Sequence, residues 1–158
     1  KPEIKWPNDI VFGTRKVAGI LLELGAELDH IRHVVLGIGI DVNLSADEMP
    51  EELRTIATSL RIEGGRTFDR SDLAATVLAE LDAAYGRLRR GDFHEISDEW
   101  MRRCSTLGQR VMIRMADRVI IGRAESLNED GALLVRTDHG RLEHIIGGDV
   151  SLAKGSTP

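Results

Sequence analysis

A short stretch near the start of the chain, KWPNDIVFGTRKVAGILLE at residues 5–23, places charged groups beside a strongly apolar run. Lys16 stands at the head of that run, so its stem can lie along an apolar wall while its ammonium stays at the mouth of a dry pocket. An ammonium with three donors binds a phosphate or a carboxylate well. Asp9, across a turn, is placed to hold this ammonium or to help position a metal-bound phosphate, and Asn8 offers a donor and an acceptor to a base edge. The pattern predicts a site for an anionic ligand.

Each of these residues also has an ordinary structural interpretation. Asn8 and Asp9 are common turn formers. Lys5 and Lys16 can be solvated side chains, and Trp6 can anchor a core. It is the combination of all of them in one hairpin that favours a ligand site.

Glycines provide a second candidate feature. Gly37 and Gly39 lie two residues apart in an apolar run, and in a buried strand this spacing leaves one face without side chains. A flat ligand can then lie against the backbone, and Gly19 in the neighbouring strand adds a third bare position. Close packing is the alternative interpretation. A dinucleotide-binding loop is not predicted, because the third glycine and the directly following helix of that fingerprint are missing.

Other catalytic chemistries find no support in the residue spacing. The five histidines show no metal-ligand spacing with Cys104, the only cysteine, so a zinc site is not expected. Cys104 lies beside two arginines on a predicted helix, and we interpret it as a packing residue rather than a nucleophile. Neither a Gly-x-Ser-x-Gly nucleophile elbow nor a Walker phosphate loop occurs.

Composition bounds the class of protein. A chain of 158 residues with 42% hydrophobic and 30% charged residues fits a globular protein of one domain or two small ones. Its net charge of -5 disfavours a general nucleic-acid binder, whose affinity comes from neutralising phosphates. The single cysteine excludes an intrachain disulfide and favours a reducing compartment. No apolar run approaches the ~20 residues that span a bilayer. We therefore expect a cytoplasmic protein without a membrane segment.

The candidate residues lie on elements that the sequence pattern also predicts. Residues 8–13 and 16–24 are expected to be strands joined by a compact turn, and residues 33–42 form a second continuous apolar run. Apolar runs without alternation are typical of strands buried on both faces, as in a sheet covered by helices.

Helices are predicted to follow these strands. Ser45-Ala-Asp-Glu48 resembles a capping box, so a helix is expected near residues 48–60. Asp69 or Ser71 can cap the next helix, and Gly91 ends it. Apolar residues recur in that helix at steps of three and four: Leu73, Val77, Leu81, Ala84 and Leu88.

The pattern changes at Gly108. From there, short stretches of alternating polarity are separated by turn sequences, and no helix pattern occurs. Such a series of short strands is typical of a small β-barrel. We predict a domain boundary near residues 104–108, which divides residues 1–106 from residues 107–158. The expected strands are 111–115, 119–126, 132–137 and 141–146.

Three blocks of residues carry a family resemblance. They are Lys5-Trp-Pro-Asn-Asp9, then Arg15-Lys16-Val-Ala-Gly19-Ile-Leu21 with Glu23, then Gly37-Ile-Gly39-Ile with Val42-Asn43. In this order and at this spacing they resemble biotin protein ligases, the biotin–[acetyl-CoA-carboxylase] ligases. The stretch from Gly108 to Leu152 is similar to the small SH3-like domain of that family. The resemblance implies an α+β fold in which a mixed β-sheet covered by helices, part of a class II synthetase-like ligase domain, precedes a small SH3-like β-barrel.

The activity that the resemblance implies is an ATP-dependent ligation in two steps. Biotin and ATP would give biotinyl-5'-adenylate and pyrophosphate. The biotinyl group would then pass to a lysine of the biotin carboxyl carrier protein domain of a carboxylase. Mg²⁺ would enter with the nucleotide, without a metal site on the protein, and nucleic acid is not an expected partner of this portion.

By the same resemblance, Lys16 would hold the biotin carboxyl and α-phosphate oxygens as charge builds in the transition state, and Asp9 would lie beside it and near the acceptor lysine. The family usually has Asn where this chain has Asp41. A carboxylate can accept from the exocyclic amine of adenine but cannot donate to a ring nitrogen, so adenine recognition is expected to differ. The implied ligand-binding residues are Trp6 and Asn8 on the nucleotide side, Gly19, Gly37 and Gly39 under biotin, Lys16 itself, Asp41 and Asn43.

The resemblance also implies an incomplete site. The Gly/Arg-rich adenylate loop of the family and most of its biotin contacts lie upstream of the first block, so we expect this chain to be the C-terminal half of a ligase that alone binds biotin poorly and ligates little or nothing. An exposed sheet edge would favour self-association, and a homodimer is a further expectation. Two alternatives stay open: a lipoate ligase-like acyl transferase and a non-catalytic binding module.

Overall fold

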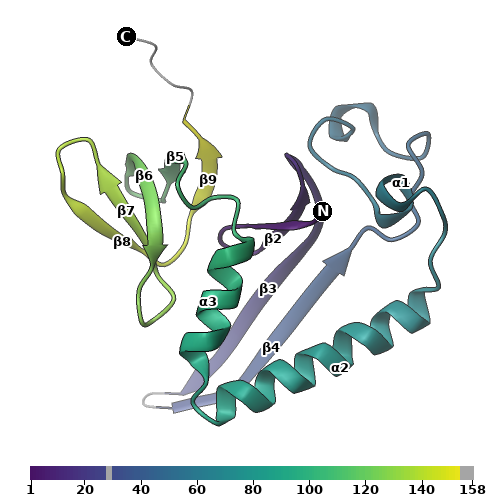
Figure 1. Ribbon diagram of the computed structural model, residues 1–158, viewed down its shortest axis with the longest axis horizontal. Helices are drawn as coiled ribbons and strands as arrows, with labels where there is room; N and C mark the ends of the chain where they lie inside the picture. Colours follow the sequence, from purple (N-terminus) through teal and green to yellow (C-terminus); the bar gives the residue numbers. More distant parts are fainter. Residues whose placement is uncertain (28–29, 154–158) are drawn as a thin grey trace. The chain divides into compact units, whose positions relative to one another are not determined.

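The computed structural model describes residues 1–27 and 30–153, and the chain divides into two compact units (Figure 1). The first unit holds residues 1–3 and 8–76, and the second unit holds residues 4–7 and the chain from residue 77 onward.

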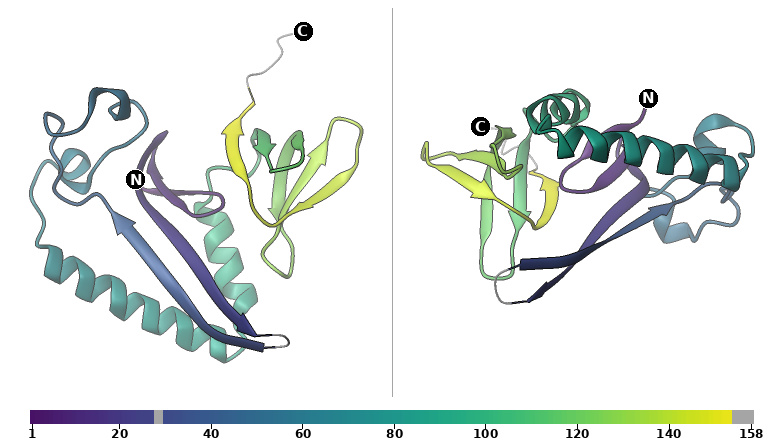
Figure 2. Two further views of the ribbon diagram at one scale, coloured as in Figure 1. Left: turned by 180° about the vertical axis from the view of Figure 1, so that it is seen from behind. Right: turned by 90° about the horizontal axis from the view of Figure 1, so that it is seen from below.

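The first unit is built on antiparallel strands. Its main strands are β2 (Asp9–Phe12), β3 (Arg15–Glu27) and β4 (His30–Ile40), and both ladders between them are antiparallel. Both views of Figure 2 show β3 and β4 side by side along their length. The short strand β1 (Glu3–Lys5) precedes them. The strands predicted at 8–13, 16–24 and 33–42 are therefore confirmed, although β3 and β4 are longer than the pattern indicated.

The tight turn between β2 and β3 depends on Gly13. This residue has φ of 60°, in the left-handed region that a glycine adopts without steric cost. The turn brings the two ends of the hairpin together, so that residues before and after it face each other across the ladder.

The predicted burial of the apolar runs is not observed. Leu22 is 60% exposed and Leu24 is 65% exposed, and Val34 and Val35 on β4 are also exposed. Their exposure means that no element in the described part of the first unit covers these positions. The apolar pattern therefore marks a surface that residues 1–27 and 30–153 leave uncovered.

The helix predicted near residues 48–60 is wrong. Ser45 donates its backbone N–H to the Glu48 carboxylate at 2.8 Å, as the capping pattern suggested, but its hydroxyl also donates to this carboxylate at 2.7 Å and only a turn follows. Pro50 explains the difference, because a proline disfavours helical backbone at the preceding residue and lacks an N–H. A short 3₁₀ helix, η1, covers Glu51–Leu53, and the helix α1 (Leu60–Gly64) begins later.

The long helix is confirmed as α2 (Arg70–Arg89), which contains the boundary between the two units. The Asp69 carboxylate accepts the backbone N–H groups of Ser71 and Asp72 at 2.8 and 3.0 Å, so Asp69 is the capping residue. None of the side chains of α2 is fully buried, and in its apolar stripe Leu81 and Leu88 are exposed while the other positions are half-buried. A shorter helix, α3 (Phe93–Arg103), follows.

The second unit contains a five-stranded sheet, in which four strands correspond to the predicted ones and a fifth, at residues 149–152, is additional. Its strand order is β8-β7-β6-β5-β9, and every ladder is antiparallel. Alternate residues of β6 are buried, which is the period of two that strands require. The strands are β5 (Arg110–Arg114), β6 (Val119–Leu127), β7 (Leu133–Thr137), β8 (Leu142–Ile145) and β9 (Asp149–Leu152).

An exposed ion pair on this sheet gives a testable pH dependence. The Arg110 guanidinium donates to both carboxylate oxygens of Asp138, at 2.5 and 2.6 Å, and these hydrogen bonds lower the pKa of Asp138. A pKa that is lower in the folded state contributes stability above the unfolded-state pKa of about 4, and that stability is lost as the pH falls through the folded-state value. We expect Asp138→Asn to lower the thermal midpoint at pH 7 slightly and to reduce the fall in midpoint between pH 7 and pH 3.

The matched control is Glu129→Gln, which removes an exposed acid of the same unit that has no ion pair among the described residues. Thermal unfolding of both variants and the wild type at the two pH values tests the expectation. An unchanged fall in midpoint for Asp138→Asn would contradict it.

Candidate functional site

The glycines and Asp9 meet in one row across the first sheet. Asp9 lies directly opposite Gly19 in the β2–β3 ladder, and Gly19 lies directly opposite Gly39 in the β3–β4 ladder. Directly opposite residues present their side chains on the same face, so this face carries the Asp9 side chain and then two bare positions. Gly37, opposite Leu21, extends the bare region. The predicted backbone floor is therefore present in the structure.

An open groove of about 520 Å³ lies over this floor. Its lining combines the bare backbone with two polar side chains and a few apolar ones. The lining residues are Asn8, Lys16, Gly19, Ile20, Leu21, Gly37, Ile38 and Gly39.

Lys16 and Asp9 form an ion pair at the rim of the groove. The Lys16 ammonium lies 2.5 Å from a carboxylate oxygen of Asp9, as the sequence interpretation anticipated. The Lys16 side chain is 49% exposed, so the ammonium is open to a ligand. An ammonium has three N–H donors, so it can bind an anion while it stays paired with Asp9. A Cβ atom on Gly19 would lie 2.8 Å from Nζ of Lys16, so this glycine is what allows the ammonium to lie over the floor.

The backbone of Lys16 is held by a segment that the sequence analysis missed. Lys16 N–H donates to Ile56 O and Lys16 O accepts from Thr58 N–H, both at 2.8 Å, which makes an isolated parallel bridge between Lys16 and Ala57. Thr58 and Ser59 are fully buried polar residues. The only local signal for this segment is Ser59, whose hydroxyl caps α1 by accepting the N–H of Ile62.

Asn8 and Trp6 have different surroundings. Asn8 donates its side-chain amide to Ile20 O at 2.5 Å and lines the groove, so it has a structural contact beside the floor. Trp6 belongs to the second unit, where its side chain is buried in the core of the sheet and its N–H donates to Thr106 Oγ1 at 3.0 Å. Trp6 is thus a core anchor, and its role beside a nucleotide stays a prediction.

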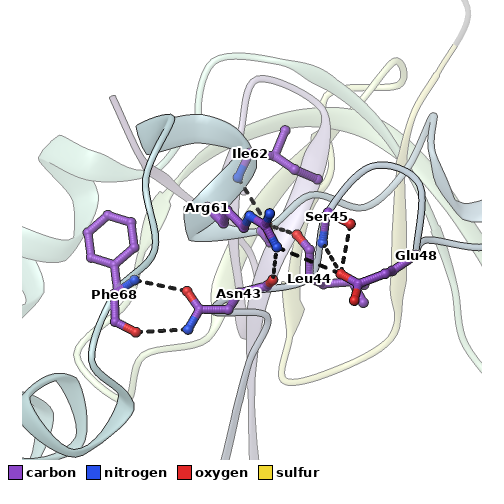
Figure 3. Close-up of polar contacts among 8 residues, drawn as sticks. Asn43, Leu44, Ser45, Glu48, Arg61, Ile62 and Phe68 are labelled. Carbon is purple, nitrogen blue, oxygen red and sulfur yellow. Dashed lines mark hydrogen bonds and ion pairs between the residues drawn. The ribbon is translucent and has the colours of Figure 1, made fainter.

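Asp41 and Asn43 lie just beyond the end of β4. The Asp41 N–H donates to Val17 O at 2.9 Å, and its side chain is exposed. Figure 3 shows the side-chain amide of Asn43 facing Phe68, where it accepts the Phe68 N–H at 2.9 Å and donates to Phe68 O at 2.8 Å. Asn43 therefore holds the loop after α1 by two hydrogen bonds to its backbone. Its place among the ligand-binding residues stays a prediction.

Residues 1–27 and 30–153 contain no group of three or more His, Cys, Asp or Glu side chains that could hold a metal ion. Within the same residues, no helix combines the length and apolarity needed to cross a membrane.

Comparison with known families agrees with the motif blocks. Residues 2–41 match the Biotin/lipoate A/B protein ligase family, and residues 106–153 match the Biotin protein ligase C terminal domain. The two matches occur in one chain and in the order that the motifs predicted. The chain belongs to the biotin protein ligase family.

Individual members of the biotin protein ligase family resemble nearly all of this chain. A Bacillus spizizenii protein named bifunctional ligase/repressor BirA is 35% identical over 150 residues, which are 95% of this chain and 46% of that protein. A biotin–[acetyl-CoA-carboxylase] ligase of Mycobacterium tuberculosis is 32% identical over 148 residues, which are 93% of this chain and 52% of that protein. The chain thus spans about half the length of these curated relatives.

Solved biotin protein ligases support the fold. The apo structure of the Aquifex aeolicus enzyme is 31% identical with a TM-score of 0.83, and the match covers 96% of this chain and 65% of that one. The same enzyme in complex with biotin and ATP is 30% identical with a TM-score of 0.80, and the match covers 98% of this chain and 62% of that one. The predicted α+β class with a C-terminal SH3-like domain is confirmed.

Proposed function

We propose that this chain supplies part of the active site of an ATP-dependent biotin protein ligase. Biotin and ATP would form biotinyl-5'-adenylate with release of pyrophosphate, and a lysine amine would then displace AMP to form an amide with biotin. The single observation that carries the proposal is the Lys16–Asp9 ion pair at the rim of a groove floored by three glycines. The Aquifex aeolicus relative in complex with biotin and ATP supports the choice of substrates.

Lys16 is proposed to bind the groups that carry charge during adenylation. The biotin carboxylate attacks the α-phosphorus, and negative charge builds on the oxygens of the pentacoordinate phosphorus. An ammonium aimed at those oxygens stabilises the transition state more than the ground state. Asp9, in an ion pair with Lys16, restrains the ammonium and is proposed to lie near the acceptor lysine in the second step.

The glycine floor is proposed to hold biotin. Gly37 and Gly39 have no close neighbour on their open face, since a Cβ on Gly37 would meet Leu21 only at 3.7 Å and a Cβ on Gly39 would meet nothing within 4 Å. The fused rings of biotin can therefore lie directly against the backbone. This contact excludes water from one side of the ligand, which strengthens the electrostatic contact made by Lys16.

The nucleotide is proposed to lie beside Asn8, with Trp6, Asp41 and Asn43 as further candidates from the family pattern. Mg²⁺ would enter bound to the phosphates of ATP. The acceptor is proposed to be the biotin carboxyl carrier domain of a carboxylase, in the cytoplasm.

Two further proposals concern the organisation of the chain. We propose a ligase portion at residues 1–106 and an SH3-like domain at residues 107–158. We also propose that the protein forms a homodimer.

Asp41 gives a prediction about the nucleotide. A carboxylate accepts hydrogen bonds but does not donate to a ring nitrogen, whereas an amide does both. In the full-length protein that contains this chain, we expect Asp41→Asn to lower the KM for ATP by about 3- to 10-fold, the size of one hydrogen bond. Steady-state kinetics at saturating biotin measure this. Asp117→Asn, an exposed position in the second unit, is the control, and an unchanged or raised KM in Asp41→Asn would contradict the expectation.

The function itself is tested by exchange of labelled pyrophosphate into ATP, catalysed by the full-length protein. Exchange that requires biotin and does not occur with lipoate is the expected result. Exchange driven by lipoate would favour the acyl transferase alternative. Absence of exchange with either acid would favour a non-catalytic binding module.

A further inference from the structure

We propose that Glu63 is a positioning residue for Lys16, an inference that rests on the proposed function. Glu63 Oε1 accepts the Arg15 Nη2 donor at 2.7 Å and the Thr58 hydroxyl at 2.6 Å. The Glu63 side chain is only 18% exposed, so the carboxylate is held in a mostly dry environment. One carboxylate oxygen therefore ties together two residues that both adjoin Lys16.

The two partners of Glu63 flank Lys16 in different ways. Arg15 precedes Lys16 along β3, and Thr58 donates its backbone N–H to the carbonyl of Lys16 at 2.8 Å. Glu63 therefore fixes the strand just before Lys16 to the segment that bonds the Lys16 backbone. A displacement of either partner would be transmitted to the Lys16 backbone.

The bridge at Lys16 needs such support because it is isolated. Lys16 and Ala57 form a single parallel bridge rather than a ladder, and on the opposite side the β2–β3 register shifts between Ile10 and Val11. Neighbouring ladder bonds that would hold a regular strand pair in register are therefore few here. Thr58 is fully buried, so loss of the carboxylate would also leave its hydroxyl without the acceptor that it now uses.

Glu63 and Asp9 have different roles because they pair with cations on opposite faces of β3. Successive side chains of a strand point to opposite faces, so Arg15 and Lys16 lie on different faces. Each cation has its own carboxylate, Glu63 for Arg15 and Asp9 for Lys16. Glu63 thus has no contact with the ligand groove and acts on the ammonium only through the backbone. A misplacement of about 1 Å at a reacting group costs on the order of 10²-fold in rate.

The test uses Glu63→Ala in the full-length protein. We expect the kcat for biotin-dependent exchange of pyrophosphate into ATP to fall by about 10- to 100-fold, since a misplacement of about 1 Å costs up to ~10²-fold in rate. The KM for ATP should change little. Glu63→Gln keeps an acceptor and the side-chain volume, so its loss should be smaller, and it serves if Glu63→Ala does not fold. Glu80→Ala, an exposed acid on α2, is the control for loss of a negative charge.

A double-mutant cycle separates positioning from a general structural role. If Glu63 acts through Lys16, then Glu63→Ala should have no further effect on exchange in the Lys16→Ala background. Equal losses in both backgrounds, or a kcat for folded Glu63→Ala within two-fold of wild type, would overturn the inference and leave the proposed function standing. A wild-type protein without biotin-dependent exchange would overturn both.

Discussion

Lys16→Ala in the full-length protein is expected to lower the rate of biotinyl-5'-adenylate formation by about 10²-fold or more. Loss of a charge contact that strengthens in the transition state has effects of this size. The substitution should leave the fold intact, because the Lys16 side chain is half exposed and the bonds that hold this position come from its backbone. The rate is measured in single-turnover experiments with biotin and ATP in excess.

Lys16→Arg is the informative companion variant. Arginine keeps the positive charge but places it in a planar fork rather than at a point. We expect partial activity from it, between the wild type and Lys16→Ala. Adenylate formation by Lys16→Ala within a few-fold of the wild type would contradict the role that we assign to the ammonium.

Gly39→Ala is expected to raise the dissociation constant for biotin without destabilising the protein. A Cβ at this position would meet no protein atom within 4 Å, so the fold accommodates the methyl group. The methyl group projects onto the bare floor and would force a ligand away from the backbone. Overpacking of a close contact costs ~1–3 kcal/mol, which corresponds to roughly 5- to 150-fold in affinity.

The matched control for Gly39→Ala is Gly147→Ala. A Cβ on Gly147 also meets nothing within 4 Å, and this residue lies in the second unit, between β8 and β9. Isothermal titration of biotin into both variants of the full-length protein measures the effect. Equal affinities in Gly39→Ala and Gly147→Ala would argue against a biotin floor at the glycines.

Elements with strong local signals could be predicted from the sequence. Four of the five strands of the second unit followed from alternation and turn residues, and α2 followed from its apolar spacing and the Asp69 cap. These signals act over a few residues and do not depend on the rest of the fold. The helix expected near residues 48–60 failed because Pro50 disfavours helical backbone, although one hydrogen bond of the capping pattern, from Ser45 N–H to the Glu48 carboxylate, does form.

Burial could not be predicted from the pattern in the same way. The apolar runs of β3 and β4 indicate strands that need cover on both faces, yet Leu22 and Leu24 are exposed. Periodicity indicates that a strand needs apolar cover on its faces, but it does not indicate which segment provides that cover. The chain spans about half the length of its curated relatives, which is consistent with a surface that the described residues leave uncovered.

The residues of the candidate site likewise fall into those that the sequence predicted and those that only the structure shows. Lys16, Asp9 and the glycines lie in short motif blocks, and the structure brings them together across one hairpin and the adjacent strand. Glu63 and Thr58 are more than 40 residues from Lys16 along the chain, and no motif links them to it. Contacts of this kind arise from the tertiary structure, so the sequence alone does not predict them.

Native mass spectrometry of the full-length protein, after incubation with biotin, ATP and Mg²⁺, shows whether biotinyl-5'-adenylate forms and whether its formation depends on Lys16. We expect a retained ligand with the mass of biotinyl-5'-adenylate in the wild type, and none when ATP is omitted or when Lys16 is replaced by alanine. A wild-type protein that retains no adenylate, or a Lys16→Ala variant that forms and retains as much as the wild type, would contradict an adenylation site centred on Lys16.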